Sequence, residues 1–164
     1  MRLTKCLIVF LTTMLGLSSC GRGLVYTSAV PNAPVQISIN TKDAFFVHFT
    51  PDNVGQWLIV DKDGFHLNGK QTLPRTFADY YGYAGLVIVV NCYSQYSAYD
   101  LCCPNCLDRN HPVEVLDGST AVCPICGEVY NLAFGLGDPT MGIGKEFLRR
   151  YSCMYSGDRL TVRN

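Results

Sequence analysis

Four cysteines arranged as two C-x-x-C pairs are the residues best suited to chemistry in this 164-residue chain. The first pair is Cys103 and Cys106, and the second pair, Cys123 and Cys126, follows after 16 intervening residues. A spacing of two residues lets a tight turn aim both thiolates at one ion, and a proline after the first cysteine pre-sets the backbone there. Four thiolates that meet at one point suit zinc or iron better than calcium or magnesium. The spacing therefore predicts one metal site built from these four residues.

The same cysteines also allow chemistry without a metal. Each pair could close into a disulfide if the chain is exported to an oxidising compartment. The first pair is similar to the C-P-x-C dithiol of exported thiol oxidoreductases, which implies thiol–disulfide exchange at Cys103 and Cys106. That chemistry needs a helix that begins at the first cysteine, whereas the polar residues after Cys106 end at Pro112. His111 is the only nearby histidine and could replace one sulfur ligand.

Five of the nine cysteines lie outside the two pairs. Cys92 and Cys153 fall in apolar segments, so we expect packed thiols there rather than ligands. Cys102 directly precedes the first pair and should face away from the metal, because neighbouring side chains in a strand point to opposite sides. Cys6 and Cys20 belong to the N-terminal region. Three of these five thiols therefore remain in the folded domain, none of them as an expected ligand.

Residues 1–19 have the architecture of an export signal peptide. Two positive charges in residues 1–5 precede an apolar run over residues 6–17, and two serines follow. The run is shorter than the roughly 20 residues that a membrane-spanning helix needs. The segment Leu17-Ser18-Ser19-Cys20 resembles the bacterial lipoprotein box, in which the cysteine is lipidated and becomes the first mature residue. This resemblance implies a protein of the bacterial cell envelope that is held by lipid at Cys20, with the outer membrane as its expected place and either face of it open.

The type of export signal bears on the choice of metal. The charged residues at its start, Arg2 and Lys5, do not form an Arg-Arg pair, so we expect export by the general route, unfolded, rather than by the twin-arginine route. An iron–sulfur cluster assembled in the cytosol would be lost on that route. Zinc can bind after export, and the signal therefore favours zinc slightly over a cluster.

The elements that must position the cysteines have the pattern of an all-β fold. Short segments rich in β-branched and aromatic residues are interrupted by turn-forming residues about every eight to twelve positions. Residues 86–90 are continuously apolar and predict a central strand buried on both faces, and Asp117-Gly118 and Gly157-Asp158 predict hairpin turns. We expect one short helix over Thr41–Phe49 and a packed surface loop over residues 73–85. The expected strands cover residues 24–30, 35–39, 57–60, 86–92, 96–99, 113–116, 120–122, 129–132, 148–155 and 159–162.

The sequence after the second pair carries a family resemblance. Residues 123–132 read CPICGEVYNL, and glycines follow at positions 135, 137 and 142. This resembles the second box of the Rieske iron–sulfur domain, C-P-x-H-G-x-x-F/Y with a glycine-rich turn after it. The first box, C-x-H, corresponds to residues 103–105. The resemblance extends over most of residues 35–162 and looks closest to the Rieske-like lipoproteins of bacteria. It implies a Rieske-like antiparallel β-sandwich over residues 34–164, after a lipidated tether at 20–33, with a small metal-binding subdomain of rubredoxin or zinc-ribbon type at about 99–142.

This chain departs from the Rieske pattern at the ligands. Asn105 and Cys126 stand where the family has its two cluster histidines, and Ile143 stands where its cluster-covering loop has a proline. A centre with two histidines on one iron is therefore not expected. A four-cysteine 2Fe-2S cluster, a mononuclear iron or zinc site, and a metal-free fold remain open. Zinc closed by four protein ligands has no position for a substrate, so it would be structural.

Composition limits the function classes. The chain has 13 basic and 13 acidic residues, so nothing in its net charge points to nucleic acid. Its length leaves little room for a separate catalytic domain beside the cysteine site, and we expect no stand-alone enzyme. The sequence therefore predicts a membrane-anchored lipoprotein with a structural zinc in a non-catalytic binding module. Electron transfer through a 2Fe-2S cluster and thiol–disulfide exchange are the alternatives, and no protein partner is indicated.

Overall fold

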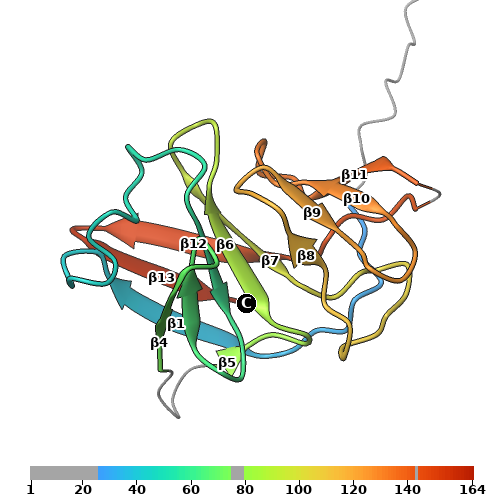
Figure 1. The fold of residues 1–164 in the computed structure, drawn as a ribbon, viewed down its shortest axis with the longest axis horizontal. Helices are drawn as coiled ribbons and strands as arrows, with labels where there is room; N and C mark the ends of the chain where they lie inside the picture. Colours follow the sequence, from blue (N-terminus) through green and yellow to red (C-terminus); the bar gives the residue numbers. More distant parts are fainter. Residues whose placement is uncertain (1–25, 75–79, 143) are drawn as a thin grey trace, which may run out of the picture.

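The computed structural model describes residues 26–74, 80–142 and 144–164. The expected signal peptide, the expected lipidation site Cys20 and the start of the expected tether lie outside the described residues, as does Ile143. Every regular element of the described chain is a β-strand, and paired strands are antiparallel (Figure 1). None of the described residues forms a helix of the length and apolarity that crossing a membrane requires. The prediction of an all-β fold is confirmed.

The described residues form thirteen strands, most of them short. In chain order they are β1 (Val35–Asn40), β2 (Trp57–Val60), β3 (Phe65–Leu67), β4 (Gln71–Leu73), β5 (Tyr80–Tyr81), β6 (Leu86–Val90), β7 (Tyr96–Asp100), β8 (Glu114–Val115), β9 (Thr120–Val122), β10 (Val129–Asn131), β11 (Asp138–Met141), β12 (Arg150–Ser156) and β13 (Arg159–Arg163).

The larger sheet has nine strands in the order β4-β3-β2-β6-β7-β12-β13-β1-β5. Strand β12 pairs with β7 through its first two residues and with β13 along the rest, so the sheet turns back on itself there. The side chains inside this fold form the first core, which draws on strands from both halves of the sheet. On β1 they are Val35, Ile37 and Ile39, which alternate with exposed Gln36 and Ser38. The alternation expected for this strand is confirmed.

A second sheet, of four strands in the order β11-β10-β9-β8, covers the outer face of β6 and β7 (orange in Figure 1). The contact forms the second core, in which Val87 and Val89 of β6 pack with Tyr130 and Leu132. The other side chains of β6, at positions 86, 88 and 90, belong to the first core. Strand β6 is therefore buried on both faces, as its uninterrupted apolar sequence predicts.

Both predicted hairpin turns are present, although for different reasons. At Gly157 and Asp158, between β12 and β13, φ is 53° and 71°, the left-handed conformation that a tight hairpin turn requires. At Gly118, between β8 and β9, φ is not positive. A Cβ atom there would lie 2.0 Å from the carbonyl oxygen of Gly55. The glycine at 118 therefore allows the small sheet to approach the backbone of the turn that precedes β2.

The helix expected over Thr41–Phe49 is wrong. The segment is a series of turns, each closed by a backbone hydrogen bond between residues three apart. Examples run from the Phe46 N–H to the Asp43 carbonyl at 2.8 Å and from the Phe49 N–H to the Phe46 carbonyl at 2.8 Å. Phe46 and Phe49 are buried in the first core. Anchoring both aromatic side chains in that core outweighs the weak helix preference of a segment rich in aromatic and β-branched residues.

The strand expected over residues 24–30 is also wrong in its described part. Residues 26–30 pair with no strand. Isolated hydrogen bonds connect them to the chain before β12, such as that from the Phe147 N–H to the Thr27 carbonyl, at 3.0 Å. Residues 24 and 25 lie outside the described chain.

Four strands were not expected from the sequence: β3, β4, β5 and β11. Strands β3 and β4 form a hairpin around Asn68 and Gly69, where φ is 48° and 66°, and this Asn-Gly pair is a signal that could have predicted it. The loop expected over residues 73–85 begins with the last residue of β4 and contains β5, which pairs with β1. Residues 75–79 of that loop lie outside the described chain.

Candidate metal site

The two C-x-x-C pairs form the same local turn, which we call a knuckle. The first knuckle, residues 103–107, follows β7, and the second knuckle, residues 123–127, connects β9 to β10. In the first, the Leu107 N–H donates to the Cys103 carbonyl at 2.9 Å, and in the second the Gly127 N–H donates to the Cys123 carbonyl at 2.9 Å. The residue after each pair has a positive φ, 55° at Leu107 and 71° at Gly127. Each knuckle thus turns both of its sulfurs to one side.

The knuckles face each other, so that the four predicted cysteines come together. Cys103 Sγ lies 3.7 Å from Cys126 Sγ, and Cys106 Sγ lies 3.7 Å from Cys123 Sγ. All four sulfurs lie within 4.8 Å of one another. This donor set fits a soft or borderline ion such as zinc or iron. Four cysteines that could hold one metal ion are therefore gathered as the sequence spacing predicts.

The alternatives to a four-sulfur site find less support in the geometry. All seven cysteines of the described chain are free thiols, and neither pair forms a disulfide. The residues after Cys106 form a turn and not the helix that a redox-active dithiol uses. His111 is exposed, and its Nδ1 lies 2.8 Å from Asp108 Oδ2, so it is not one of the converging ligands.

Three further cysteines of the described chain lie outside the cluster. Cys102 is fully buried, as expected for a side chain that faces away from the metal. Cys153 is half-buried and packs against the first core. Cys92 is exposed, so the packed thiol expected there is wrong, because β6 ends at Val90 and Cys92 lies in the turn beyond it.

The buried sulfur of the first knuckle has a polar neighbour that the cysteine spacing does not reveal. The hydroxyl of Tyr130, on β10, lies 3.2 Å from Cys103 Sγ, and both side chains are buried. Burial raises the pKa of Tyr130, so its hydroxyl stays protonated and is able to donate a hydrogen bond to a Cys103 thiolate. Burial also raises the pKa of Cys103, while hydrogen bonds from Tyr130 and from the Cys106 and Asn105 N–H groups act in the opposite direction. These donors would stabilise a thiolate bound to a metal.

The exposed sulfur of the second knuckle is surrounded by donors. Partial burial raises the pKa of Cys126, but hydrogen bonds from the Glu128 N–H, the Asn105 side chain and neighbouring thiols outweigh it and lower the pKa to about 7. Burial and the adjacent thiols instead raise the pKa of Cys106. The metal-free cluster therefore carries both protonated and ionised sulfur at neutral pH.

Glu128 holds the second knuckle and was not predicted. Its carbonyl accepts the Cys123 N–H at 2.8 Å, and its buried carboxylate accepts the Gly144 N–H at 2.7 Å. A Cβ atom at Gly142 would lie 2.3 Å from Glu128 Oε2, so this glycine makes room for the carboxylate. The glycines at 142 and 144 are a signal for such a close approach, although they do not say to which residue.

Asp100 holds the first knuckle and was not predicted either. This fully buried carboxylate ends β7 and accepts four hydrogen bonds. Oδ1 accepts the N–H groups of Cys102 at 2.9 Å and Ala84 at 3.1 Å, and Oδ2 accepts the Tyr83 N–H at 2.6 Å and the Tyr151 hydroxyl at 2.8 Å. Burial raises the pKa of Asp100, and these donors oppose the rise. A single acid at the end of an apolar strand was the only signal in the sequence.

Four cysteine ligands would complete a tetrahedral shell, which leaves no position for a substrate on the ion. The arrangement therefore suits a structural site or an electron carrier better than a site that activates water. Comparisons with protein families, with curated proteins and with solved structures find no match to this chain. The four-cysteine cluster in an all-β chain is thus the feature on which its function must be argued.

Proposed function

We propose that the chain is a lipid-anchored protein of the bacterial envelope in which Cys103, Cys106, Cys123 and Cys126 bind one zinc ion, and that it works as a non-catalytic binding module. The observation that carries the proposal is the convergence of the four sulfurs within 4.8 Å. The zinc would be structural, because a closed shell joins two loops that belong to different sheets and offers no open position.

The sulfur spacing favours a single ion. Four ligands at about 2.3 Å around a tetrahedral zinc place sulfur pairs about 3.8 Å apart. Two pairs across the knuckles are 3.7 Å apart, and no pair exceeds 4.8 Å. A 2Fe-2S cluster, in which two cysteines hold each iron, requires more space between the pairs. Electron transfer through such a cluster is therefore the weaker alternative.

Membrane anchoring and Rieske-like descent belong to the same proposal. The Leu17-Ser18-Ser19-Cys20 segment supports lipidation at Cys20 and hence an envelope location, most naturally the outer membrane. The CPICGEVY segment, residues 123–130, supports a Rieske-like domain, as does a small antiparallel sheet that carries the second knuckle and lies beside a larger sheet, whose strand β7 leads into the first knuckle. The assignment of 34–164 as the domain and about 99–142 as its metal-binding part follows this resemblance.

Metal analysis of the purified mature protein tests the metal. We expect a colourless protein with one zinc per chain, and we expect Cys123→Ser to lose the zinc and to melt at a lower temperature. Visible absorption, together with iron and sulfide in the sample, would show that the site holds a 2Fe-2S cluster instead of zinc. An unchanged melting curve and metal content in Cys123→Ser would overturn the four-cysteine site.

Membrane fractionation with mass spectrometry tests the anchor. The wild-type chain should sediment with membranes and carry acyl chains at its N-terminus, and Cys20→Ser should lose both properties. Cys92→Ser serves as the matched control, because that exposed cysteine lies outside the metal cluster and the lipoprotein box. A soluble wild-type protein without acyl chains would remove the anchor and leave the metal site untouched.

A further inference from the structure

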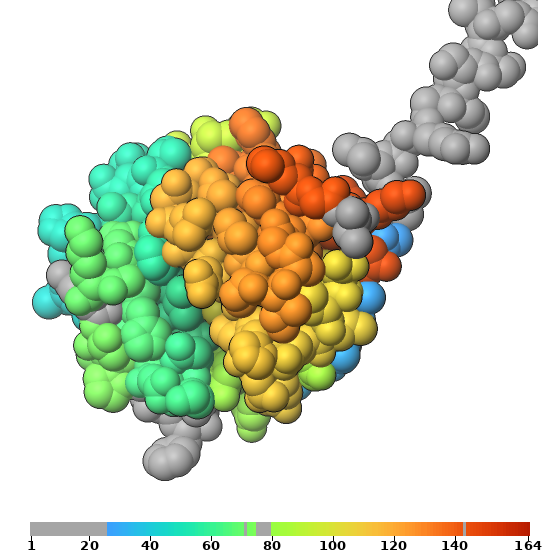
Figure 2. Space-filling model, turned by 45° about the vertical axis from the view of Figure 1, so that its right-hand side comes forward, coloured from blue at the N-terminus to red at the C-terminus, as the bar shows by residue number. Residues whose placement is uncertain are grey.

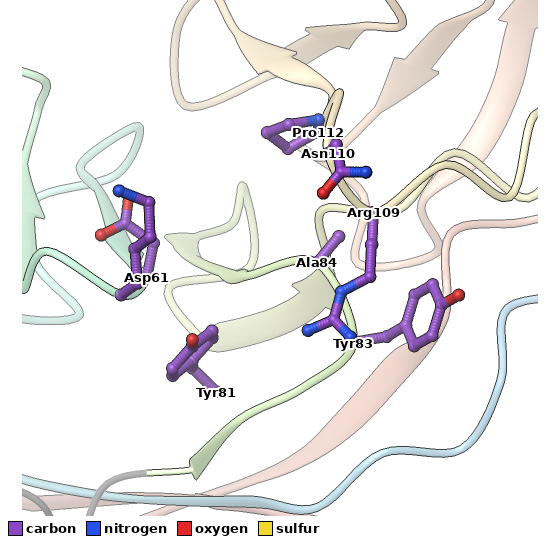
Figure 3. Close-up of a pocket in the computed structure, with 8 residues that line it drawn as sticks. Asp61, Tyr81, Tyr83, Ala84, Arg109, Asn110 and Pro112 are labelled. Atoms are coloured by element: carbon purple, nitrogen blue, oxygen red, sulfur yellow. The ribbon is translucent and has the colours of Figure 1, made fainter.

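The loop that follows the first knuckle, residues 107–112, forms one wall of a cleft of about 350 Å³. Asp61 and Lys62, in the turn between β2 and β3, form the opposite wall, and Tyr83 lies between β5 and β6. Figure 2 shows the teal and green region of β2–β4 and the yellow and orange region of the small sheet meeting along a seam, and Figure 3 shows the cleft's side chains. This volume is in the range of small-molecule sites.

Arg109 provides one wall of the cleft with a positive charge. Its guanidinium lies over the ring of Tyr83, 5.4 Å from the centroid, and Figure 3 shows it between that ring and the open centre of the cleft. No ion pair of the described residues includes Arg109. A guanidinium fixed by an aromatic ring presents a planar fork of donors, the geometry that binds a carboxylate through two hydrogen bonds. This wall therefore recognises an anion.

The opposite wall has a different character. Asp61 Oδ1 accepts the N–H groups of Asp63 at 2.8 Å and Gly64 at 3.2 Å and lies 3.0 Å from His66 Nε2. Its carboxylate would repel an acid group but accept a hydroxyl. Asn110, in the loop beside Arg109, adds an amide that both donates and accepts. The cleft thus suits a ligand with a carboxylate at one end and hydroxyls at the other.

From this arrangement we infer that the cleft binds a carboxylated sugar, with the acid group at Arg109 and the hydroxyls toward Asp61 and Asn110. Tyr81 lines the cleft as well, between the loop of Arg109 and the turn of Asp61. The aliphatic lining consists only of Ala84, Pro112 and the stem of Lys62, too little surface to hold an acyl chain. The positive charge disfavours a cationic ligand.

The inference rests on the proposed function in one respect, the role of the metal. The loop that carries Arg109 begins at Leu107, whose N–H is bound to the Cys103 carbonyl of the first knuckle. Asp108 closes the same loop, since its Oδ1 accepts the Asn110 N–H at 2.8 Å. A metal that fixes the knuckle would therefore preorganise the wall that holds the anion, and its loss would weaken binding.

Titration of the metal-loaded mature protein with methyl glucuronide, followed by amide chemical shifts, tests the inference. Shifts should concentrate at residues 81–84 and 109–110, and methyl glucoside, which lacks the acid, should bind at least tenfold more weakly. Arg109→Gln should weaken binding about tenfold, whereas Arg159→Gln, an exposed arginine at the far end of β13, should leave it unchanged. Tyr83→Phe, which keeps the ring beneath the guanidinium, should bind within about twofold of wild type.

The outcomes separate this inference from the metal proposal. Equal binding of glucuronide and glucoside, or equal loss in the two arginine variants, would overturn the carboxylate site even in a protein that contains zinc. Tighter binding of glucose 6-phosphate than of the glucuronide would overturn the choice of a carboxylate. Undiminished glucuronide binding after removal of the metal would preserve the site but refute its dependence on the knuckle.

Discussion

The two knuckles share one sequence pattern and one turn but differ in their surroundings. In the first, Cys103 and Pro104 are buried, and Asp100 ties the preceding backbone to the large sheet. In the second, Cys123 is buried as well, but Pro124 and Cys126 are exposed, and the support comes from Glu128 within the small sheet. The same motif thus forms a fixed half and a surface half of one site. A bound ion would join the small sheet to the large one through these halves.

Serine at one sulfur of each knuckle should have the largest effect. Both Cys103→Ser and Cys126→Ser should lose the metal, and Cys103→Ser should lower the free energy of unfolding by about 4 kcal/mol, because it also disturbs the buried contact with Tyr130. Cys126→Ser should lose about 1 to 2 kcal/mol less, since that side chain is exposed. Urea unfolding with metal analysis measures both. Equal losses would mean that burial of the sulfur does not set the cost of its replacement.

Replacing the carboxylate that supports each knuckle should test the same difference between the two knuckles. Asp100→Ala leaves three N–H groups and one hydroxyl without their acceptor, so we expect a loss of about 3 kcal/mol. Glu128→Ala removes the acceptor of the Gly144 N–H and should cost about 2 kcal/mol. Thermal unfolding in excess zinc measures both, with Asp100→Asn as the isosteric control. A larger loss at Glu128 would reverse the proposed order of anchoring.

Metal affinity should fall steeply as the pH falls. Burial raises the pKa of both thiols of the first knuckle, Cys103 and Cys106, so both carry protons at neutral pH in the metal-free protein. Binding of a metal must displace these protons, and since each contributes a factor of ten, the dissociation constant should rise at least about hundredfold for each pH unit lost near neutrality. The dependence should weaken at a pH above both pKa values. Competition with a chelator at several pH values measures the slope, and a flat profile would contradict thiolate ligation by this knuckle.

The smallest expected effect concerns the residue that closes each knuckle. Gly127→Ala puts a Cβ on a residue with φ of 71°, where no atom lies within 4 Å, so backbone strain alone should cost about 1 kcal/mol. Leu107→Gly relieves similar strain at φ of 55° but increases the entropy of the unfolded chain, and the two terms should cancel to within about 0.5 kcal/mol. Chemical denaturation measures both variants. A cost above 2 kcal/mol for Leu107→Gly would show that the leucine side chain itself matters.

Local patterns predicted the cysteine cluster and the central strand but not the residues that support them. The spacing of the cysteines and the apolar run of β6 are local properties that remain visible in a single sequence. Asp100 and Glu128 act through partners distant in the sequence, such as Tyr151 and Gly144, and no local pattern identifies those partners. The helix expected at Thr41–Phe49 failed for the same reason, because burial of two phenylalanines in a distant core decided its conformation.

The burial of β6 on both faces bears on how the protein unfolds. Alternate side chains of this strand fill one core, and the remaining side chains fill the other. Neither core can open without exposing one face of β6 to water. The two sheets should consequently denature in a single concerted step rather than one after the other. Amide protons of β6 should then be the last to exchange with solvent, at a rate set by global unfolding.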